Sequence, residues 1–331
     1  MPDSTSSKNR KLTLAVVAGV LLLVFVAGGS FGIWRVVTAT AQANRNATAT
    51  AQTNANRAGK RWHIQVSGTS QILTSVVWSG SQFVAVGENG TILTSPDGHA
   101  WTPQHSGTSK HLFGVAWLDS QFVAVGGGAI LTSPDGRTWT TQHFGVSSIL
   151  TGVAWSGSQF VAVGSSGAIL TSPDGRTWTP QHYNPSSSIP YLESVAWSGS
   201  QFVIVGFSGT ILTSPDGHTW TPQHSDTPHH LDGIVWTGSR FVAVGDYTTL
   251  TSPDGYTWTA QNFDGLFSLL GVVWSGTQFV AVGFDGTILT SPDGHTWMAQ
   301  HSGISQYLES VAWSGTQFVA VGEKGTILTS P

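Results

Sequence analysis

The chain of 331 residues contains no cysteine, and charged side chains are scarce. The absence of cysteine excludes a disulfide scaffold, a cysteine-ligated zinc site and a thiol nucleophile. Charged residues make up 9% of the sequence, against roughly 25% in an average globular protein. No nucleophile elbow, HExxH helix, P-loop or EF-hand loop is present. We therefore expect neither a metal ion nor a cofactor.

Aromatic residues and glycine are abundant, with 15 Trp, 15 Phe and 40 Gly. The aromatic residues supply a core and exclude disorder of the whole chain, and the glycines indicate many turns. Residues 1–61 carry eight basic residues and one acidic residue, a net charge of +7, whereas residues 62–331 have a net charge of −11. An acidic domain is repelled by phosphates, so we expect no nucleic-acid partner.

A long run without charge lies near the N-terminus. Residues 12–34 contain no charged side chain, and as a helix they would span about 34 Å, enough to cross a bilayer core. We predict a cytoplasmic basic segment at 1–11 and a transmembrane signal-anchor helix at 12–35. A low-complexity linker follows at 36–58. The basic flank places the N-terminus on the cytoplasmic side of the cell membrane and the propeller outside the cytoplasm. A cleaved signal peptide, ending near Ala39-Thr40-Ala41, stays open as an alternative.

The remainder of the chain, residues 59–331, consists of successive copies of one internal repeat. Its marker is the phenylalanine of a segment that reads Gln-Phe-Val-Ala-Val-Gly, with one substitution in each of two copies. This phenylalanine recurs every 38 to 42 residues, at Phe83, Phe122, Phe160, Phe202, Phe241, Phe279 and Phe318. Two tryptophans accompany each copy. A period near 40 residues with strand-like patterns is typical of propeller blades or a solenoid.

Each repeat contains four short β-rich runs, as in Leu192–His224, separated by turn sequences rich in Gly, Ser and Asp. The first run carries small residues, which suits a crowded centre. The fourth carries Pro103, Pro180 and Pro222, and proline belongs on an edge strand. The last repeat has no fourth run, and residues 59–65 match one. We predict an all-β, seven-bladed β-propeller closed by an N-terminal strand and preceded by one transmembrane helix.

Six repeats contain Ser-Pro-Asp-Gly-x-x-Trp, with the aspartates Asp97, Asp135, Asp174, Asp216, Asp254 and Asp293. Calcium binding or acid catalysis is one interpretation. A structural role is favoured, because an aspartate after proline in a tight turn accepts backbone N–H bonds and the glycine takes a left-handed conformation.

The motif resembles the Asp-box of BNR and sialidase-like propellers, and the run Gly286–Trp297 resembles the repeats of photosystem II assembly-factor propellers. The resemblance covers 59–331. It implies seven blades, with Asp-boxes on the face opposite the ligand site. Here glycine directly follows the aspartate, so the box is one residue short. A sialidase also needs an arginine triad, and these repeats contain only Arg137, Arg176 and Arg240. Assembly factors are expected to use an arginine-rich surface, whereas this domain is acidic. Neither activity is carried over.

Residues that vary between repeats are better functional candidates than those that recur, because recurring residues serve the fold. Glu193, Asp232 and Glu309 share one variable position in the first run, which we expect near the channel mouth. The connecting loops on the same face add acidic and aromatic side chains. The complete candidate binding face is Tyr183, Tyr191, Glu193, Phe207, Asp232, Asp246, Tyr247, Phe284, Asp285, Tyr307 and Glu309.

These features favour a membrane-anchored extracytoplasmic propeller that acts as a non-catalytic binding or assembly scaffold for a protein or glycan partner. A degenerate sialidase-like enzyme is the alternative, since paired carboxylates hydrolyse glycosides. A purely structural surface protein is the third hypothesis.

Overall fold

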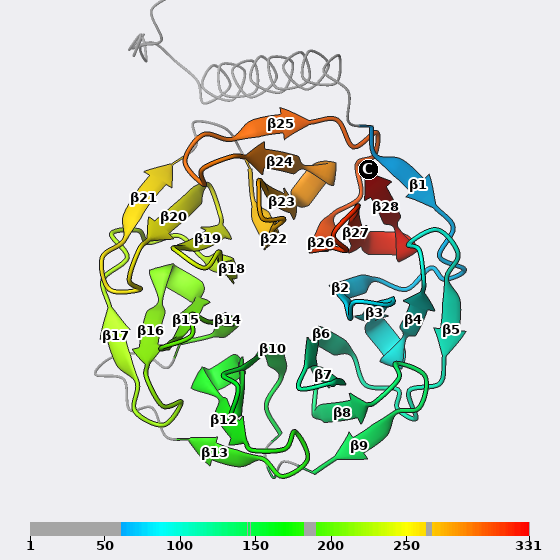
Figure 1. Ribbon diagram of the computed structural model, residues 1–331, viewed down its shortest axis with the longest axis horizontal. Helices are drawn as coiled ribbons and strands as arrows, with labels where there is room; N and C mark the ends of the chain where they lie inside the picture. The colour runs from blue at the N-terminus through cyan, green and yellow to red at the C-terminus, as the bar shows by residue number, and fades with distance from the viewer. Residues whose placement is uncertain (1–60, 144, 146, 182–189, 263–266, 331) are drawn as a thin grey trace, which may run out of the picture. The chain divides into compact units, whose positions relative to one another are not determined.

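The computed structural model describes residues 61–143, 145, 147–181, 190–262 and 267–330. Within them, 28 strands form seven four-stranded antiparallel sheets placed around a common centre (Figure 1). The predicted all-β, seven-bladed propeller is confirmed. The predicted segments 1–11, 12–35 and 36–58 lie outside the described residues. Among the residues that are described, none of the helices is long and apolar enough to span a bilayer.

Each sheet runs from the centre of the ring to its rim. The innermost strands are β2 (Leu73–Trp78), β6 (Leu112–Leu118), β10 (Leu150–Trp155), β14 (Leu192–Trp197), β18 (Leu231–Trp236), β22 (Leu269–Trp274) and β26 (Leu308–Trp313). The second strands are β3 (Phe83–Gly87), β7 (Gln121–Gly126), β11 (Phe160–Gly164), β15 (Phe202–Gly206), β19 (Phe241–Gly245), β23 (Phe279–Gly283) and β27 (Phe318–Gly322).

The third strands are β4 (Ile92–Ser95), β8 (Ala129–Ser133), β12 (Ile169–Ser172), β16 (Ile211–Ser214), β20 (Thr248–Ser252), β24 (Ile288–Ser291) and β28 (Ile327–Ser330). The rim strands are β1 (His63–Gln65), β5 (Thr102–Gln104), β9 (Thr140–Gln142), β13 (Thr179–Gln181), β17 (Thr221–Gln223), β21 (Thr259–Asn262) and β25 (Met298–Gln300). Prolines 103, 180 and 222 lie in these rim strands, as their missing N–H requires.

The core lies between neighbouring sheets. In the second strand of every sheet, all residues from the phenylalanine to the glycine are buried because both faces of the strand are covered. The phenylalanine packs between two tryptophans of the same blade. The ring centroid of Phe83 is 4.5 Å from that of Trp78 and 6.3 Å from that of Trp101. Each hydrophobic cluster joins two adjacent sheets, as where Leu73 packs with Val319.

The N-terminal strand β1 completes the last sheet. It pairs with β28, with His63 opposite Thr329 and Gln65 opposite Ile327. Trp62, directly before β1, is buried, and its ring centroid lies 6.4 Å from that of Phe318. The two ends of the propeller therefore share one sheet, in which the rim strand comes from the N-terminal end and the other three from the C-terminal end.

The turns of the six Ser-Pro-Asp-Gly-x-x-Trp motifs, called box turns below, are closed by local hydrogen bonds. Oδ1 of Asp97 accepts the N–H groups of His99 and Ala100 at 2.9 and 3.1 Å. Oγ of Ser95 accepts the N–H of Gly98 at 2.8 Å, and Gly98 adopts a left-handed φ of 76°. The N–H bonds lower the pKa of every box aspartate. The carboxylates are thus occupied by backbone donors of their own turns.

Side chains of the preceding blade donate hydrogen bonds to backbone carbonyl groups of the same turns. Nε2 of Gln82 donates to the carbonyl oxygen of Asp135 at 2.6 Å. The bond recurs at five of the six boxes, and at the remaining one Arg240 replaces glutamine and donates to the carbonyl oxygen of Asp293 at 3.1 Å. Gln317 donates to the carbonyl oxygen of Asp97, which continues the series across the ring closure.

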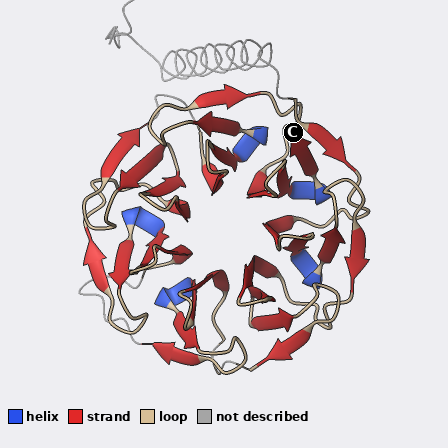
Figure 2. Cartoon of the chain, in the orientation of Figure 1, coloured by secondary structure: helices blue, strands red, loops and turns tan. Residues whose placement is uncertain are grey.

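The joints between second and third strands come in two forms. Five are short 3-10 turns, drawn in blue in Figure 2: η2 (Glu88–Gly90), η3 (Ser165–Gly167), η4 (Phe207–Gly209), η5 (Phe284–Gly286) and η6 (Glu323–Gly325). The middle residue of each has a left-handed φ near 54°. The other two joints are tighter turns, at 127–128 and at Asp246-Tyr247.

Removal of residues 59–66 is expected to abolish cooperative unfolding or to lower the melting temperature sharply. The deletion leaves the edge of β28 unpaired and uncovers Phe318. Thermal unfolding followed by circular dichroism measures this, with deletion of residues 44–51 as the length-matched control. A melting curve that is unchanged by the first deletion would contradict the role of β1 in closure.

The core of the fifth blade contains a buried polar group without a hydrogen-bond partner among the described residues. Thr249 is 1% exposed, and its Oγ1 has no hydrogen-bond partner among the described residues. It pairs with Val244 at the register position where Ile92 pairs with Val86 in the first blade. A hydroxyl therefore lies where other blades bury a methyl group.

Thr249→Val is expected to raise the free energy of unfolding by about 1 kcal/mol, because valine keeps the shape and removes an unpaired hydroxyl. Denaturant unfolding measures it. The matched control is Thr248→Val, since Oγ1 of Thr248 donates to the carbonyl oxygen of Gln261 at 3.3 Å and this change should not stabilise. Equal effects of both substitutions would count against the explanation.

Candidate functional site

The two faces of the ring carry different connections. Because the strands of each blade are antiparallel, the box turns and the turns after the innermost strands lie on one face. The turns η2–η6 and the connections from each rim strand to the next innermost strand lie on the other. We call this second face the variable face, because its loops differ in length and sequence from blade to blade.

A β-bulge recurs at the start of every innermost strand on this face. Between the first and third residues of the strand, the pairing shifts by one, so the second residue is left out of the ladder. A bulge redirects the side chain of its extra residue. All seven bulge residues line one cavity of about 420 Å³: Thr74, Phe113, Thr151, Glu193, Asp232, Leu270 and Glu309. We call them the bulge ring.

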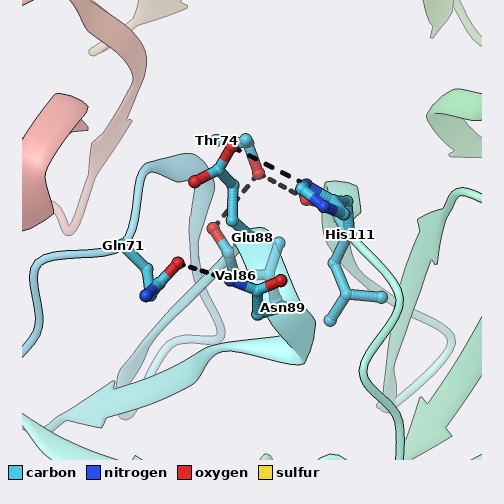
Figure 3. A network of polar contacts seen from close by, with 7 residues as sticks. Gln71, Thr74, Val86, Glu88, Asn89 and His111 are labelled. Atoms are coloured by element: carbon cyan, nitrogen blue, oxygen red, sulfur yellow. Dashed lines mark hydrogen bonds and ion pairs between the residues drawn. The ribbon is translucent and has the colours of Figure 1, made fainter.

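The threonines show which partners a bulge side chain meets. Oγ1 of Thr74 donates to the carbonyl oxygen of Leu112 in the next blade at 2.6 Å and to that of Val86 at 3.2 Å (Figure 3). Thr151 makes the same pair of bonds, to Leu192 at 2.8 Å and to Val163 at 3.2 Å. The hydroxyl hydrogen thus points toward carbonyl acceptors at this position of the blade.

Three bulge positions hold carboxyl groups instead. An ionised carboxylate has no hydrogen to donate, so in their charged forms Glu193, Asp232 and Glu309 cannot replace the threonine bonds. Oδ2 of Asp232 is buried and has no hydrogen-bond partner in the described chain. No lysine, arginine or histidine is among the described residues that line the cavity. The cavity is therefore rich in acceptors and poor in donors.

Burial raises the pKa of all three carboxyl groups. It raises the pKa of Glu193 and that of Glu309 to about 7. The pKa of Asp232 rises to about 8, chiefly through burial and then through repulsion from Glu193, Asp246 and Glu309. Repulsion from Glu323 and Glu88 adds to the rise for Glu309. Withdrawal from water and like charge both favour the protonated forms.

Aromatic pairs lie outside the bulge ring. A Cβ on Gly206 would collide with the carbonyl oxygen of Tyr191, so glycine lets the two loops approach. The ring centroids of Tyr191 and Phe207 are 4.9 Å apart, and those of Phe207 and His230 are 4.1 Å apart. His230 also accepts the N–H of Ser208 through Nδ1 at 3.0 Å.

A second aromatic pair joins blades six and seven. Phe284 of η5 stacks on Tyr307 with ring centroids 4.3 Å apart and planes inclined by 6°. Phe284 is 38% exposed, as are Phe207 and Tyr247 to similar extents. Partly exposed rings at this position are available for contact with a partner.

Polar pairs occupy the equivalent positions elsewhere on the variable face. Oε1 of Glu88 lies 3.7 Å from Nδ1 of His111, and Nδ2 of Asn89 donates to Oε1 of Gln71 at 2.7 Å (Figure 3). Oγ of Ser268 donates to Oδ1 of Asp246. These contacts and the aromatic stacks fix the loops around the cavity.

The structure unites part of the predicted binding face. Glu193, Asp232 and Glu309 line one cavity, while Tyr191, Phe207, Phe284 and Tyr307 form stacks around it. Tyr247 packs edge-on to His229 at 5.7 Å between ring centroids, and Asp246 bonds Ser268. Asp285 lines a different hollow, beside Ile64 and His301. Tyr183 lies outside the described residues.

Sequence analysis overlooked six residues of this region, which are Thr74, Phe113, Thr151, Leu270, Glu88 and His111. The first four occupy the same repeat position as Glu193, so aligning that position in all seven repeats would have found them. No signal in the sequence reveals the pairing of Glu88 with His111 across two blades. No group of three or more His, Asp or Glu able to hold a metal ion occurs within the described segments.

The free energy of unfolding is expected to fall as the pH rises from about 4 to 8. The raised carboxyl pKa values mean that the folded protein binds more protons than the unfolded chain in this window. Each unit of pKa shift corresponds to about 1.4 kcal/mol as an upper limit. Glu309→Gln should flatten the decline and raise the melting temperature near pH 8.

The matched control is Asp119→Asn, which removes one exposed acid from the turn after β6 on the opposite face. Melting temperatures measured between pH 5 and 8 compare the two variants. If Glu309→Gln and Asp119→Asn have the same pH profile, Glu309 is not the source of the dependence.

Comparisons with known proteins support the architecture. No protein-family model matches the chain, and no curated protein matches its sequence. Among solved structures, YCF48 bound to D1 peptide is 18% identical with a TM-score of 0.65, covering 81% of this chain and 94% of that one. YCF48 from Cyanidioschyzon merolae is 18% identical with a TM-score of 0.66, over 81% and 98%. A streptogramin B lyase structure is 8% identical with a TM-score of 0.72, over 82% and 97%. At these identities, the likeness shows that this chain shares the propeller fold with them.

Proposed function

We propose that the propeller is a non-catalytic scaffold that binds a protein partner through its variable face. The observation that carries this proposal is the arrangement of that face, where seven bulge side chains surround a cavity and partly exposed aromatic stacks flank it. Recognition surfaces are often built on loops that a rigid scaffold holds in place. The opposite face is taken up by box turns whose carboxylates bond their own backbone.

The fold supports a protein rather than a glycan as the partner. One structure with the same fold, YCF48, was solved bound to D1 peptide. The aromatic rings of this chain stack mainly on one another, as Phe207 does between Tyr191 and His230. A sugar ring prefers an uncovered aromatic face, so a glycan partner is the less favoured outcome.

Membrane attachment is part of the proposal. Residues 12–35 would anchor the chain, with the basic residues 1–11 inside and the propeller outside the cytoplasm. The support is the run of 23 uncharged residues at 12–34 and the basic flank before it. The linker 36–58 would then separate the propeller from the bilayer.

A second candidate function rests on the carboxyl groups. Glu193 and Glu309 have pKa values of about 7, the range that suits a general acid near neutral pH. A glycoside-active enzyme would use them as a pair. Turnover of fluorogenic glycosides by the full chain, lost in both Glu193→Gln and Glu309→Gln, would favour this candidate over the scaffold.

Photo-crosslinking from the variable face is expected to trap one discrete protein. p-Benzoylphenylalanine at position 284, introduced into the full chain in its native membranes, should give one protein adduct, because Phe284 is 38% exposed there. The matched control is position 256. Tyr256 is 54% exposed and lies in a box turn on the opposite face.

Mass spectrometry of the adducts identifies what is trapped. Equal trapping from positions 284 and 256 would contradict recognition through the variable face. An adduct that resists protease but is removed by glycosidases would show that the partner is a glycan and not a protein.

A further inference from the structure

We propose that the cavity inside the bulge ring receives the side chain of a lysine or arginine residue from the partner protein. This inference rests on the proposed scaffold function and specifies the chemistry of its partner. It is argued from the lining of the cavity, from the unpartnered oxygen of Asp232, and from the charge of the domain.

The lining calls for a ligand that donates hydrogen bonds. Thr74 and Thr151 show that a bulge side chain faces carbonyl oxygens of its own and the next blade. Glu193, Asp232 and Glu309 bring further acceptors to equivalent positions. A lysine ammonium has three donors and no acceptor, and an arginine guanidinium has five. Either group complements a cavity of acceptors, whereas a neutral amide would bring an acceptor of its own.

Asp232 places an unpaired acceptor in the cavity. Its Oδ2 is buried without a hydrogen-bond partner in the described chain, and such groups in native proteins normally have one. Asp232 is also the carboxyl group that Glu193 and Glu309 both repel. A cation between the three would offset that repulsion and give the oxygen a donor.

A side chain fits the geometry better than a metal ion. The carboxyl groups come from blades four, five and seven, and no three acidic or histidine groups among the described residues lie close enough to hold one metal ion. A basic side chain can bond one or two carboxyl groups and fill apolar space with its stem. Ile234, Leu270 and Val272 supply apolar lining beside the acids.

The charge of the propeller favours the same partner. Residues 62–331 have a net charge of −11, and charge complementarity speeds association and excludes like-charged partners. The stacked rings outside the cavity, Phe284 on Tyr307 among them, would contact the residues that flank the basic side chain.

Binding of capped tripeptides to the purified full chain tests the proposal near pH 8. Acetyl-Gly-Arg-Gly-amide and acetyl-Gly-Lys-Gly-amide are the probes, with acetyl-Gly-Gln-Gly-amide as the neutral control. Chemical-shift or calorimetric titration should show that at least one basic peptide binds about tenfold more tightly than the glutamine peptide, since a bond to a charged group contributes on the order of 1.5–3 kcal/mol.

Substitutions in the cavity identify the site. Asp232→Asn, which keeps the shape of the side chain, should weaken binding of the basic peptide about fivefold or more. Glu193→Gln should also weaken this binding, and Asp119→Asn on the opposite face should leave it unchanged. Thermal unfolding confirms that each variant folds, and Glu309→Gln replaces any variant that does not.

Several results would overturn the proposal. These are equal binding of all three peptides, equal weakening by Asp119→Asn and Asp232→Asn, and tighter binding of spermidine or Ca²⁺ than of either basic peptide. The scaffold function is judged separately. If the protein trapped from position 284 is still trapped after Asp232→Asn and Glu193→Gln are combined, the scaffold stands and the basic side chain does not.

Discussion

The pairing of β1 with β28 is the constraint on which the rest of the propeller depends. Each of the seven sheets buries its faces against two neighbours, so no sheet has a free face once the ring is closed. Without β1, the last sheet would have three strands and Trp62 would leave Phe318 uncovered. The three backbone pairs from His63 to Gln65 therefore hold together residues that are more than 260 positions apart in the chain.

Closure also determines where the variable face lies and what it contains. A ring of seven similar blades brings seven equivalent positions around one axis, although they are spread over more than 230 residues. The β-bulge then takes one residue per blade out of the ladder. Glu193, Asp232 and Glu309 meet in one cavity for this reason, and not because any local motif assembles them.

Much of this arrangement could be predicted from the sequence. The spacing of the phenylalanines predicted seven blades, and the proline positions predicted the rim strands. The match between residues 59–65 and a fourth run predicted the strand that completes the last sheet. The shared position of Glu193, Asp232 and Glu309 predicted a common place near the channel. These features depend on periodicity, which a single sequence displays directly.

Other features depend on contacts between blades, and no sequence pattern shows them. Within each blade, the bulge between the first and second strands was not predicted either, because it is a shift in backbone pairing that the side-chain pattern does not display. The stack of Phe207 on His230 and the pairing of Glu88 with His111 join loops of different repeats. Asp285 was included in the candidate binding face because its loop lies on that face, yet it lines a different hollow from Glu193, Asp232 and Glu309. Periodicity assigns a residue to a face but not to a position on it.

The bulge has one more consequence. A residue that takes no part in strand pairing can be exchanged without altering the ladder on either side, as the variety of Thr, Phe, Glu, Asp and Leu at this position already shows. The residues that form the strand ladders are thus distinct from the seven bulge residues that surround the central cavity. Substitution of those seven residues could therefore change the binding specificity of the propeller while its fold stays the same.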